Sequence, residues 1–104
     1  MKAEKQPIMT RQEIERTILN YLISYQVKEI SIFGSYARFE ESKTSDIYIL
    51  VVFKKTPSLL KMIQIENELS EKLGLKVDLV TDASIKNKVI RKSIDKDLQI
   101  IYHA

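Results

Sequence analysis

The segment from Ser31 to Phe53, SIFGSYARFEESKTSDIYILVVF, constrains the fold more than any other part of the chain. It starts as a strand, breaks at Gly34-Ser35, and passes through polar residues into a second strand that opens on Asp46. The second strand is dense in Ile, Leu and Val, which is typical of a central strand covered on both faces. A glycine lets a backbone come close, and a serine at a helix start favours an anion. The segment therefore predicts a sheet in which a phosphate-handling turn precedes a strand that begins on a carboxylate.

Helices and strands alternate along the rest of the chain. Thr10 to Glu13 has the capping-box form, which predicts a helix start, and Gly74 suits a left-handed helix end. Apolar residues at steps of two, or of three and four, separate strands from helices. The expected elements are a helix at 10–25, strands at 28–33 and 46–53, a helix at 59–73, a strand at 75–80, a helix at 85–94 and an edge strand at 98–102. The apolar stripe expected for the second helix consists of Leu59, Leu60, Met62, Ile63, Leu69 and Leu73. This order predicts an α/β (α+β) layer structure with helices packed on a small sheet.

Length and composition limit the class of protein. The 104 residues, 44% hydrophobic and 30% charged, fit one globular domain over 1–104 and not two separate cores. There are no cysteines, which excludes disulfides and thiolate metal sites, and the single His103 cannot form a histidine cluster. No apolar run approaches the roughly 20 residues of a membrane span, and the N-terminus lacks a signal-peptide core. We expect a soluble, cytoplasmic protein without membrane contact.

Two carboxylates and one phenol are the candidates for chemistry. Asp46 and Tyr48 project from the same face of one strand, because strand side chains repeat every two residues. Asp78 lies inside another apolar strand, where a carboxylate is unfavourable unless it meets a cation or good donors. If the two strands are neighbours, Asp46 and Asp78 can converge on one ion. Mg²⁺ prefers such oxygen ligands, with substrate phosphates and water completing the shell.

The spacing of these residues resembles a known signature. Gly34-Ser35, ten residues, Asp46-Ile47-Tyr48 and a later Asp78 are similar to the Gly-Ser, ten residues, Asp-x-Asp and third acid of the DNA polymerase β-like nucleotidyltransferase superfamily. "GSYAR", "SDIYILV" and "KVDLV" look like its small prokaryotic members, the minimal nucleotidyltransferases of the MntA type. The resemblance covers most of the chain and implies the small mixed sheet of the polymerase β-like palm fold.

The resemblance also implies an activity and a partner. Gly34 and Ser35, with Arg38 near them, would bind the phosphates of ATP. Asp46 and Asp78 would ligate Mg²⁺, and Asp78 would also orient or deprotonate the acceptor hydroxyl. The family transfers a nucleoside monophosphate, commonly AMP, to a hydroxyl. Its small members typically act as antitoxins of a HEPN-domain ribonuclease toxin, in known cases by adenylylating a toxin tyrosine.

The sequence departs from the family pattern at two positions. Tyr48 stands where the second Asp is expected, and a neutral phenol is not an anionic metal ligand near pH 7. Phe39 stands where relatives usually carry glycine, which can reshape the turn. Tyr48 either fills a site that has lost activity, which we favour, or stacks on a base or accepts a nucleotide itself. Arg38 either neutralises a phosphate or pairs with a neighbouring glutamate on the surface.

Three functions follow from these observations. The leading hypothesis is an antitoxin of the nucleotidyltransferase fold whose transfer of AMP is weakened or lost because of Tyr48. The second is an inactive binding module that neutralises a toxin by covering it. The third is a nucleic-acid-binding domain that uses the basic segment 85–96, with Lys86, Lys88, Arg91, Lys92 and Lys96. We do not expect direct nucleic-acid binding, because a solvated helix face explains such lysines more simply.

Overall fold

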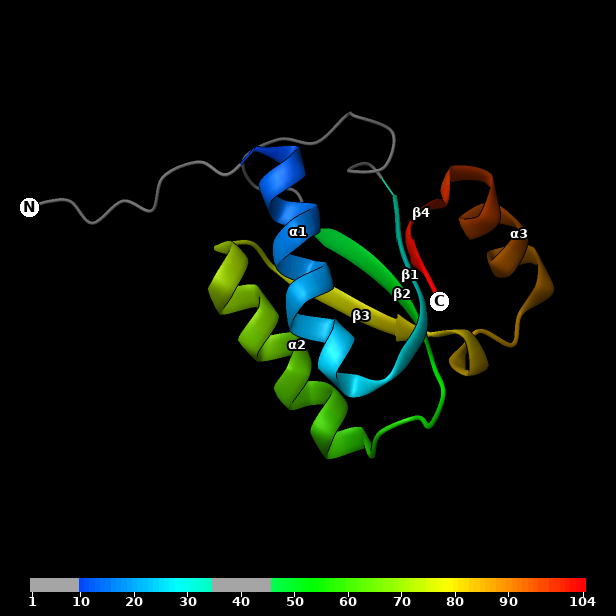
Figure 1. Ribbon diagram of the computed structural model, residues 1–104. Coiled ribbons are helices and arrows are strands. Elements are labelled where there is room, and N and C mark those ends of the chain that lie inside the picture. The colour runs from blue at the N-terminus through cyan, green and yellow to red at the C-terminus, as the bar shows by residue number, and fades with distance from the viewer. Residues whose placement is uncertain (1–9, 35–45) are drawn as a thin grey trace, which may run out of the picture.

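Four strands form one mixed sheet in the order β3-β2-β1-β4 (Figure 1). The computed structural model describes residues 10–34 and 46–104. β1 pairs antiparallel with β2 and β4, whereas β2 pairs parallel with β3. The strands are β1 (Val27–Phe33), β2 (Ile47–Phe53), β3 (Val77–Thr81) and β4 (Gln99–His103). The predicted mixed sheet and its C-terminal edge strand are confirmed, with boundaries shifted by one or two residues.

The first helix begins where the sequence predicts. In α1 (Arg11–Leu22), the amide of Glu13 donates to Thr10 Oγ1 (3.1 Å), and the amide of Thr10 donates to Glu13 Oε1 (2.8 Å). This reciprocal pair satisfies two amides that have no partner inside the helix. A short 3₁₀ turn, Ile23–Tyr25, then leads to Gln26, whose left-handed backbone (φ 57°) turns the chain into β1.

The helices α1 and α2 (Leu59–Leu73) cover one face of the sheet, and the hydrophobic core lies between these helices and the sheet. Alternate strand residues point toward the two helices because side chains on a strand change face at every residue. The helices supply residues from one stripe each, at steps of three and four. The buried residues of this core include Ile14, Ile18 and Leu22 from α1, Ile65, Leu69 and Leu73 from α2, and Ile30, Ile32, Ile47, Ile49, Val51 and Val77 from the strands.

The second helix corrects part of the sequence prediction. Its start at Ser58, whose Oγ accepts from the Lys61 amide (3.2 Å), and its end at Gly74 (φ 68°) agree with the expected bounds. The predicted stripe is wrong in its first half, because Leu59, Leu60 and Ile63 are exposed. The buried stripe runs along the C-terminal half of α2 instead, where the helix lies over β3. Neither α2 nor any other helix among the described residues is long and apolar enough to cross a membrane.

The last helix, α3 (Lys88–Asp97), lies on the other side of the sheet from α1 and α2 (Figure 1). It connects β3 at one edge with β4 at the opposite edge, and it contacts β1 on the way. Ser31 of β1 and Leu50 of β2 pair with each other and are fully buried, although they alternate with residues that face α1 and α2. The second face of the sheet is therefore covered over part of its area.

Candidate functional site

The two predicted carboxylates lie on neighbouring strands. β2 and β3 run parallel with Tyr48 paired to Asp78, and the amide of Ile47 donates to the carbonyl of Lys76 (2.9 Å). Asp46 directly precedes β2, so it lies beside the entry to β3. The strands that carry Asp46 and Asp78 are hydrogen-bonded neighbours, which is the arrangement needed for the two carboxylates to converge on one ion.

Asp46, Tyr48 and Asp78 share one face of the sheet. Their neighbours in sequence, Ile47 and Val77, are paired with each other and point into the core between the sheet and α1 and α2. Side chains alternate along each strand, so the three polar residues point to the opposite face, the one that α3 covers in part. All three are half-buried. The sheet thus presents two carboxylates and a phenol together, at the end where β2 and β3 begin.

The ring of Tyr48 packs against two residues at the end of β1, Phe33 and Gly34. Phe33 is its cross-strand partner, and the two ring centroids are 5.5 Å apart at an interplanar angle of 32°. A Cβ placed on Gly34 would lie only 2.9 Å from Tyr48 Cδ2, which is closer than real Cβ contacts allow. The phenol ring therefore occupies the space directly beside the glycine of the turn.

Gly34 adopts the backbone conformation that favours glycine, with φ at 86°. This agrees with the prediction of a sharp break after β1 at a position where the backbone can be approached closely. The other predicted parts of the phosphate side, Ser35, Arg38, Phe39 and the helical turn at 36–38, lie outside the described residues. Their assignment rests on the sequence.

The donor set fits a hard cation that shares its shell with substrate. Two carboxylates on adjacent strands, together with phosphate oxygens and water, are the ligands that Mg²⁺ typically takes. Within 10–34 and 46–104, no three His, Cys, Asp or Glu side chains are grouped to hold a metal ion. Tyr48 occupies the strand position from which a third carboxylate would join Asp46 and Asp78. The described residues therefore suit a site of two acids and not one of three.

Sequence reasoning missed how Tyr48 is held. The alternation of side chains puts Phe33 on the same face of its strand as Ser31, but it does not give the register with the neighbouring strand. The register that sets Phe33 opposite Tyr48 depends on how residues 35–45 connect the two strands. The only sequence signal was that Phe33 directly precedes Gly34, which puts an aromatic residue at the end of the strand.

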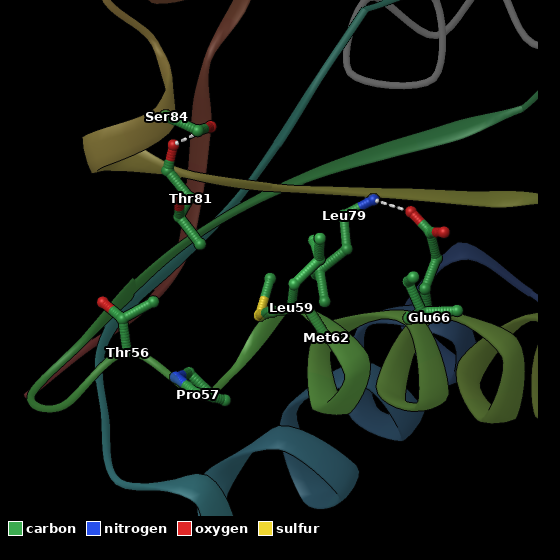
Figure 2. Close-up of a pocket in the computed structure, with 9 residues that line it drawn as sticks. Thr56, Pro57, Leu59, Met62, Glu66, Leu79, Thr81 and Ser84 are labelled. Carbon is green, nitrogen blue, oxygen red and sulfur yellow. Dashed lines mark hydrogen bonds between the residues drawn. The ribbon is translucent and has the colours of Figure 1, made fainter.

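A cavity lies away from these carboxylates. An open cavity of about 410 Å³ is lined by the first turns of α2, the chain before it and the C-terminal end of β3 (Figure 2). The Glu66 carboxylate at its edge accepts a hydrogen bond from the Leu79 amide (2.7 Å), and Ser84 Oγ donates to the Thr81 carbonyl (2.8 Å). The predicted site residues are at the opposite end of β2, where the strand begins. The sequence prediction did not identify this cavity, because it counted Leu59 and Ile63 as core.

Comparison with known proteins gives sequence relatives among archaeal proteins. The Methanocaldococcus jannaschii protein MJ1217, whose name assigns it provisionally to the protein adenylyltransferases, is 57% identical over 74 residues, which cover 71% of this chain and 76% of that protein. The Thermococcus cleftensis protein adenylyltransferase MntA is 48% identical over 67 residues, which cover 64% of this chain and 68% of that protein.

Solved structures share the fold. A toxin–antitoxin structure with AMP-PNP matches with a TM-score of 0.77 at 23% identity, over 86% of this chain and 73% of the other. A structure of a tri-AMPylated Shewanella oneidensis HEPN toxin with an MNT antitoxin matches with a TM-score of 0.75 at 23% identity, over 91% and 74% of the chains. The family model described as polymerase beta, nucleotidyltransferase, matches residues 16–104. Together with the sequence relatives, this match means that the chain belongs to the polymerase beta nucleotidyltransferase family.

Proposed function

We propose that this chain is the antitoxin of a HEPN/MNT toxin–antitoxin pair and that it transfers AMP from ATP to a tyrosine hydroxyl of its toxin, in the cytoplasm, at a rate lowered by Tyr48. The observation that carries the proposal is the placement of Asp46 and Asp78 on one face of adjacent parallel strands, beside the turn at Gly34. The names of the sequence relatives support AMP transfer to a protein. The similar toxin–antitoxin structures, one with AMP-PNP and one with a tri-AMPylated HEPN toxin, support the partner and the substrate.

Each residue of the site has a chemical role in this proposal. Gly34 and Ser35 bind the triphosphate, and Arg38 neutralises phosphate charge. Asp46 and Asp78 hold Mg²⁺, which neutralises phosphate charge when bound. Asp78 orients the acceptor and takes its proton as the acceptor oxygen bonds to the α-phosphorus. Pyrophosphate leaves as the bond between the α- and β-phosphates breaks.

Tyr48 lowers the rate for two physical reasons. It removes one negative charge from a cluster that otherwise would have three, so Mg²⁺ is held less tightly. Loss of a residue that hydrogen-bonds to a metal ligand typically costs about 10–100-fold in metal affinity or activity. Loss of a ligand itself costs at least as much. Its ring also lies against Gly34, in the space where the backbone of the turn would otherwise be open to a phosphate.

The same contact favours a second function, that of an inactive binding module. If the ring beside Gly34 prevents ATP from binding, the chain neutralises the toxin by covering it, and the carboxylates play no part. The two functions differ in the fate of the nucleotide and agree on the partner. A nucleic-acid-binding role remains the third possibility and depends on the lysines of 85–96.

The test is transfer of radiolabelled AMP from ATP to the toxin encoded by the neighbouring gene. We expect slow, Mg²⁺-dependent labelling that Asp46→Asn abolishes and Tyr48→Asp increases. The matched control is Glu71→Gln, which neutralises an exposed carboxylate of α2 on the other side of the sheet and should leave labelling unchanged. Isothermal titration of ATP and Mg²⁺ separates the alternatives, since no heat from nucleotide together with tight toxin binding would leave only the binding module. No binding of the toxin at all would refute both.

A further inference from the structure

Lys76 lies beside the two carboxylates of the candidate site. It directly precedes β3, and its carbonyl accepts from the amide of Ile47 (2.9 Å), the first residue of β2. Asp46 likewise precedes β2, and because the first residues of the two strands are paired, Asp46 and Lys76 are neighbours across the strands. Neighbouring strands lie about 5 Å apart, and residues two apart on one strand are separated by about 6–7 Å. Lys76 is therefore within side-chain reach of both Asp46 and Asp78.

The side chain of Lys76 points to the face of the sheet that carries the carboxylates. The residues on either side of it, Leu75 and Val77, both pack against the core between the sheet and α1 and α2. Side chains alternate along an extended chain, so Lys76 points the other way, as Asp78 does. Lys76 is exposed, whereas Asp46 and Asp78 are half-buried. Its flexible four-carbon stem lets the ammonium group reach over the site from solvent.

The ammonium group of Lys76 has no ionic partner in the part of the chain that the structure describes. Among residues 10–34 and 46–104, no ion pair includes Asp46 or Asp78 either. By contrast, Lys72 of α2 lies over the ring of Tyr21, with Nζ 5.6 Å from the ring centroid. A cation that is not paired with the acids beside it can bind the phosphate of a ligand.

The place of Lys76 in the sheet determines which phosphate it can contact. The strand order puts β2 between β3 and β1 (Figure 1). In the proposed function the triphosphate is held at Gly34, at the end of β1, and the acceptor lies at Asp78 of β3. The α-phosphorus, to which the acceptor bonds, must lie between them. Lys76 is on the β3 side, so it can reach the α-phosphate, and the terminal phosphates are farther away.

We propose that Lys76 contacts the substrate and compensates for the acid that Tyr48 replaces. Its ammonium group donates hydrogen bonds to a non-bridging oxygen of the α-phosphate while AMP is transferred. Lys76 keeps its proton, and no covalent bond to it forms or breaks. The inference rests on the proposed function and adds a residue to its site. Cations held where charge develops on a transferring phosphoryl group lower the barrier to transfer.

The compensation follows from the charge of the site. Phosphoryl-transfer enzymes often use two metal ions, which stabilise the attacking and leaving oxygens. A site with three carboxylates and two Mg²⁺ has the same net formal charge as a site with two carboxylates, one Mg²⁺ and a lysine. Tyr48 removes a carboxylate, and Lys76 supplies a cation. Lys76 should therefore matter most when residue 48 is tyrosine and least when it is an acid.

The experiment measures transfer of AMP by the full chain, from ATP radiolabelled at the α-phosphate, to the toxin encoded by the neighbouring gene. The test variants are Lys76→Met and Lys76→Arg, each combined with Tyr48 and with Tyr48→Asp. Lys55→Met is the matched control, because it makes the same change at an exposed lysine beyond the C-terminal end of β2. The affinity for Mn²⁺ without nucleotide, measured by electron paramagnetic resonance, is a second readout that does not depend on transfer. Circular dichroism and toxin binding show that each variant is folded.

In the chain with Tyr48, Lys76→Met should slow labelling at least about tenfold, and Lys76→Arg should keep most of the rate because the positive charge remains. In the Tyr48→Asp chain, Lys76→Met should slow labelling less than about threefold. Without nucleotide, Lys76→Met should bind Mn²⁺ about two- to fivefold more tightly, because a cation beside the carboxylates no longer repels the ion. Lys55→Met should leave the rate and the affinity within about twofold of the unmodified chain.

Slower transfer together with tighter Mn²⁺ binding is a result that a purely structural lysine cannot give. Labelling by Lys76→Met at the unmodified rate would overturn the inference, and so would an equal loss with Tyr48 and with Tyr48→Asp. Weaker Mn²⁺ binding with a lower melting temperature would also overturn it. In that case Lys76 only offsets the C-terminal dipole of α2, which ends at Gly74.

The failure of the inference can be told apart from the failure of the proposed function. If the unmodified chain labels the toxin and Lys76→Met does so equally well, the proposed function survives and only the inference is lost. If neither the unmodified chain nor Tyr48→Asp labels the toxin, the proposed function fails and the inference fails with it.

Discussion

The ring of Tyr48 lies so close to Gly34 that a Cβ on the glycine would be 2.9 Å from Tyr48 Cδ2. Gly34 also has a left-handed backbone, with φ at 86°. These two facts make position 34 intolerant of a side chain for separable reasons. One is the conformation of the turn, and the other is the aromatic residue that stands in place of an expected acid.

Gly34→Ala should lower the free energy of unfolding by about 1–3 kcal/mol, since alanine is strained at this φ and its methyl group meets the ring. In a Tyr48→Ala background the penalty should be smaller, because only the backbone strain remains. Gly74→Ala is the control, because Gly74 is also left-handed (φ 68°) but ends α2. Its penalty should be the same in both backgrounds. Urea unfolding measures all six chains, and a Gly34→Ala penalty that does not depend on Tyr48 would contradict the contact.

Tyr48→Asp should change how stability responds to metal. Without Mg²⁺ the variant should melt at a lower temperature than the unmodified chain, because three carboxylates on one face of adjacent strands repel one another. Added Mg²⁺ should raise its melting temperature more than that of the unmodified chain, since a ligand that binds only the folded state stabilises it. Tyr48→Asn removes the ring without adding charge and should show no such gain. Thermal scans with Mg²⁺ and with excess chelator measure this, and equal shifts in the Asp and Asn variants would contradict a metal site at Asp46 and Asp78.

A hydrogen bond between Tyr21 of α1 and Glu68 of α2 should make stability depend on pH. Tyr21 donates its hydroxyl to Glu68 Oε1. Burial and this bond raise the pKa of Tyr21 above its usual 10.0, and the bond lowers the pKa of Glu68 below its usual 4.5. The raised pKa of Tyr21 contributes stability that is lost as the pH rises above 10. The lowered pKa of Glu68 contributes stability that is lost as the pH falls below 4.5.

Tyr21→Phe should therefore lower the melting temperature by a few degrees between about pH 5 and 9, and by less at pH 3. Tyr25→Phe is the control, because Tyr25 contacts Tyr21 (3.4 Å between the hydroxyl oxygens) but, within the residues that the structure describes, forms no hydrogen bond with Glu68. It should show a smaller effect that changes little between pH 5 and 3. A Tyr21→Phe loss of the same size at pH 3 and pH 7 would mean that the carboxylate is not the partner that matters.

The two halves of α2 should respond differently to truncation. Leu69 is fully buried, and Leu69→Ala should lower the free energy of unfolding by about 2–5 kcal/mol through lost contacts and a cavity. Leu60 is 80% exposed, and Leu60→Ala should change the free energy of unfolding by less than about 0.5 kcal/mol. Chemical denaturation compares the two. A large loss from Leu60→Ala would mean that the sequence prediction of one stripe along the whole helix is right after all.

The difference between these leucines shows where sequence reasoning succeeds and where it stops. The apolar spacing and Gly74 were enough to predict the limits of α2, because both act locally. They could not show which turns of the helix lie over a strand. α2 has 15 residues, or about 22 Å, whereas β3 has 5, or about 17 Å, so the helix extends past the strand that it covers.

The candidate site could likewise be predicted only in part from the sequence. The face shared by Asp46 and Tyr48 follows from the period of a strand, and Asp78 was a candidate because a carboxylate inside an apolar strand is unfavourable without a cation or good donors. The contact between Tyr48 and Gly34 could not be predicted, since it depends on the register of two strands joined through 35–45. The exposure of Val89 and Ile90 on α3 could not be predicted either, because apolar spacing alone does not show whether a helix face is buried.

The outer edge of β3 should depend on two side chains of α2. Parallel pairing with β2 uses alternate residues of β3, and the amides of Val77 and Leu79 point the other way, toward the free edge. Ser70 Oγ accepts from the Val77 amide (3.0 Å) while donating to the Glu66 carbonyl (2.9 Å), and Glu66 Oε2 accepts from the Leu79 amide (2.7 Å). These bonds satisfy amides that would otherwise be available to the strand of another chain.

Ser70→Ala and Glu66→Ala should each lower the free energy of unfolding by about 1–3 kcal/mol, because a half-buried amide loses its acceptor. Glu66→Gln keeps an oxygen in the same place and should lose less than Glu66→Ala. The variant with both alanines should also aggregate faster at high concentration, since the edge of β3 is then open to pairing between molecules. Urea unfolding and light scattering measure the two effects. Equal stability of the Gln and Ala variants would show that the carboxylate does not hold the Leu79 amide in solution, and unchanged scattering would show that α2 protects this edge by its bulk alone.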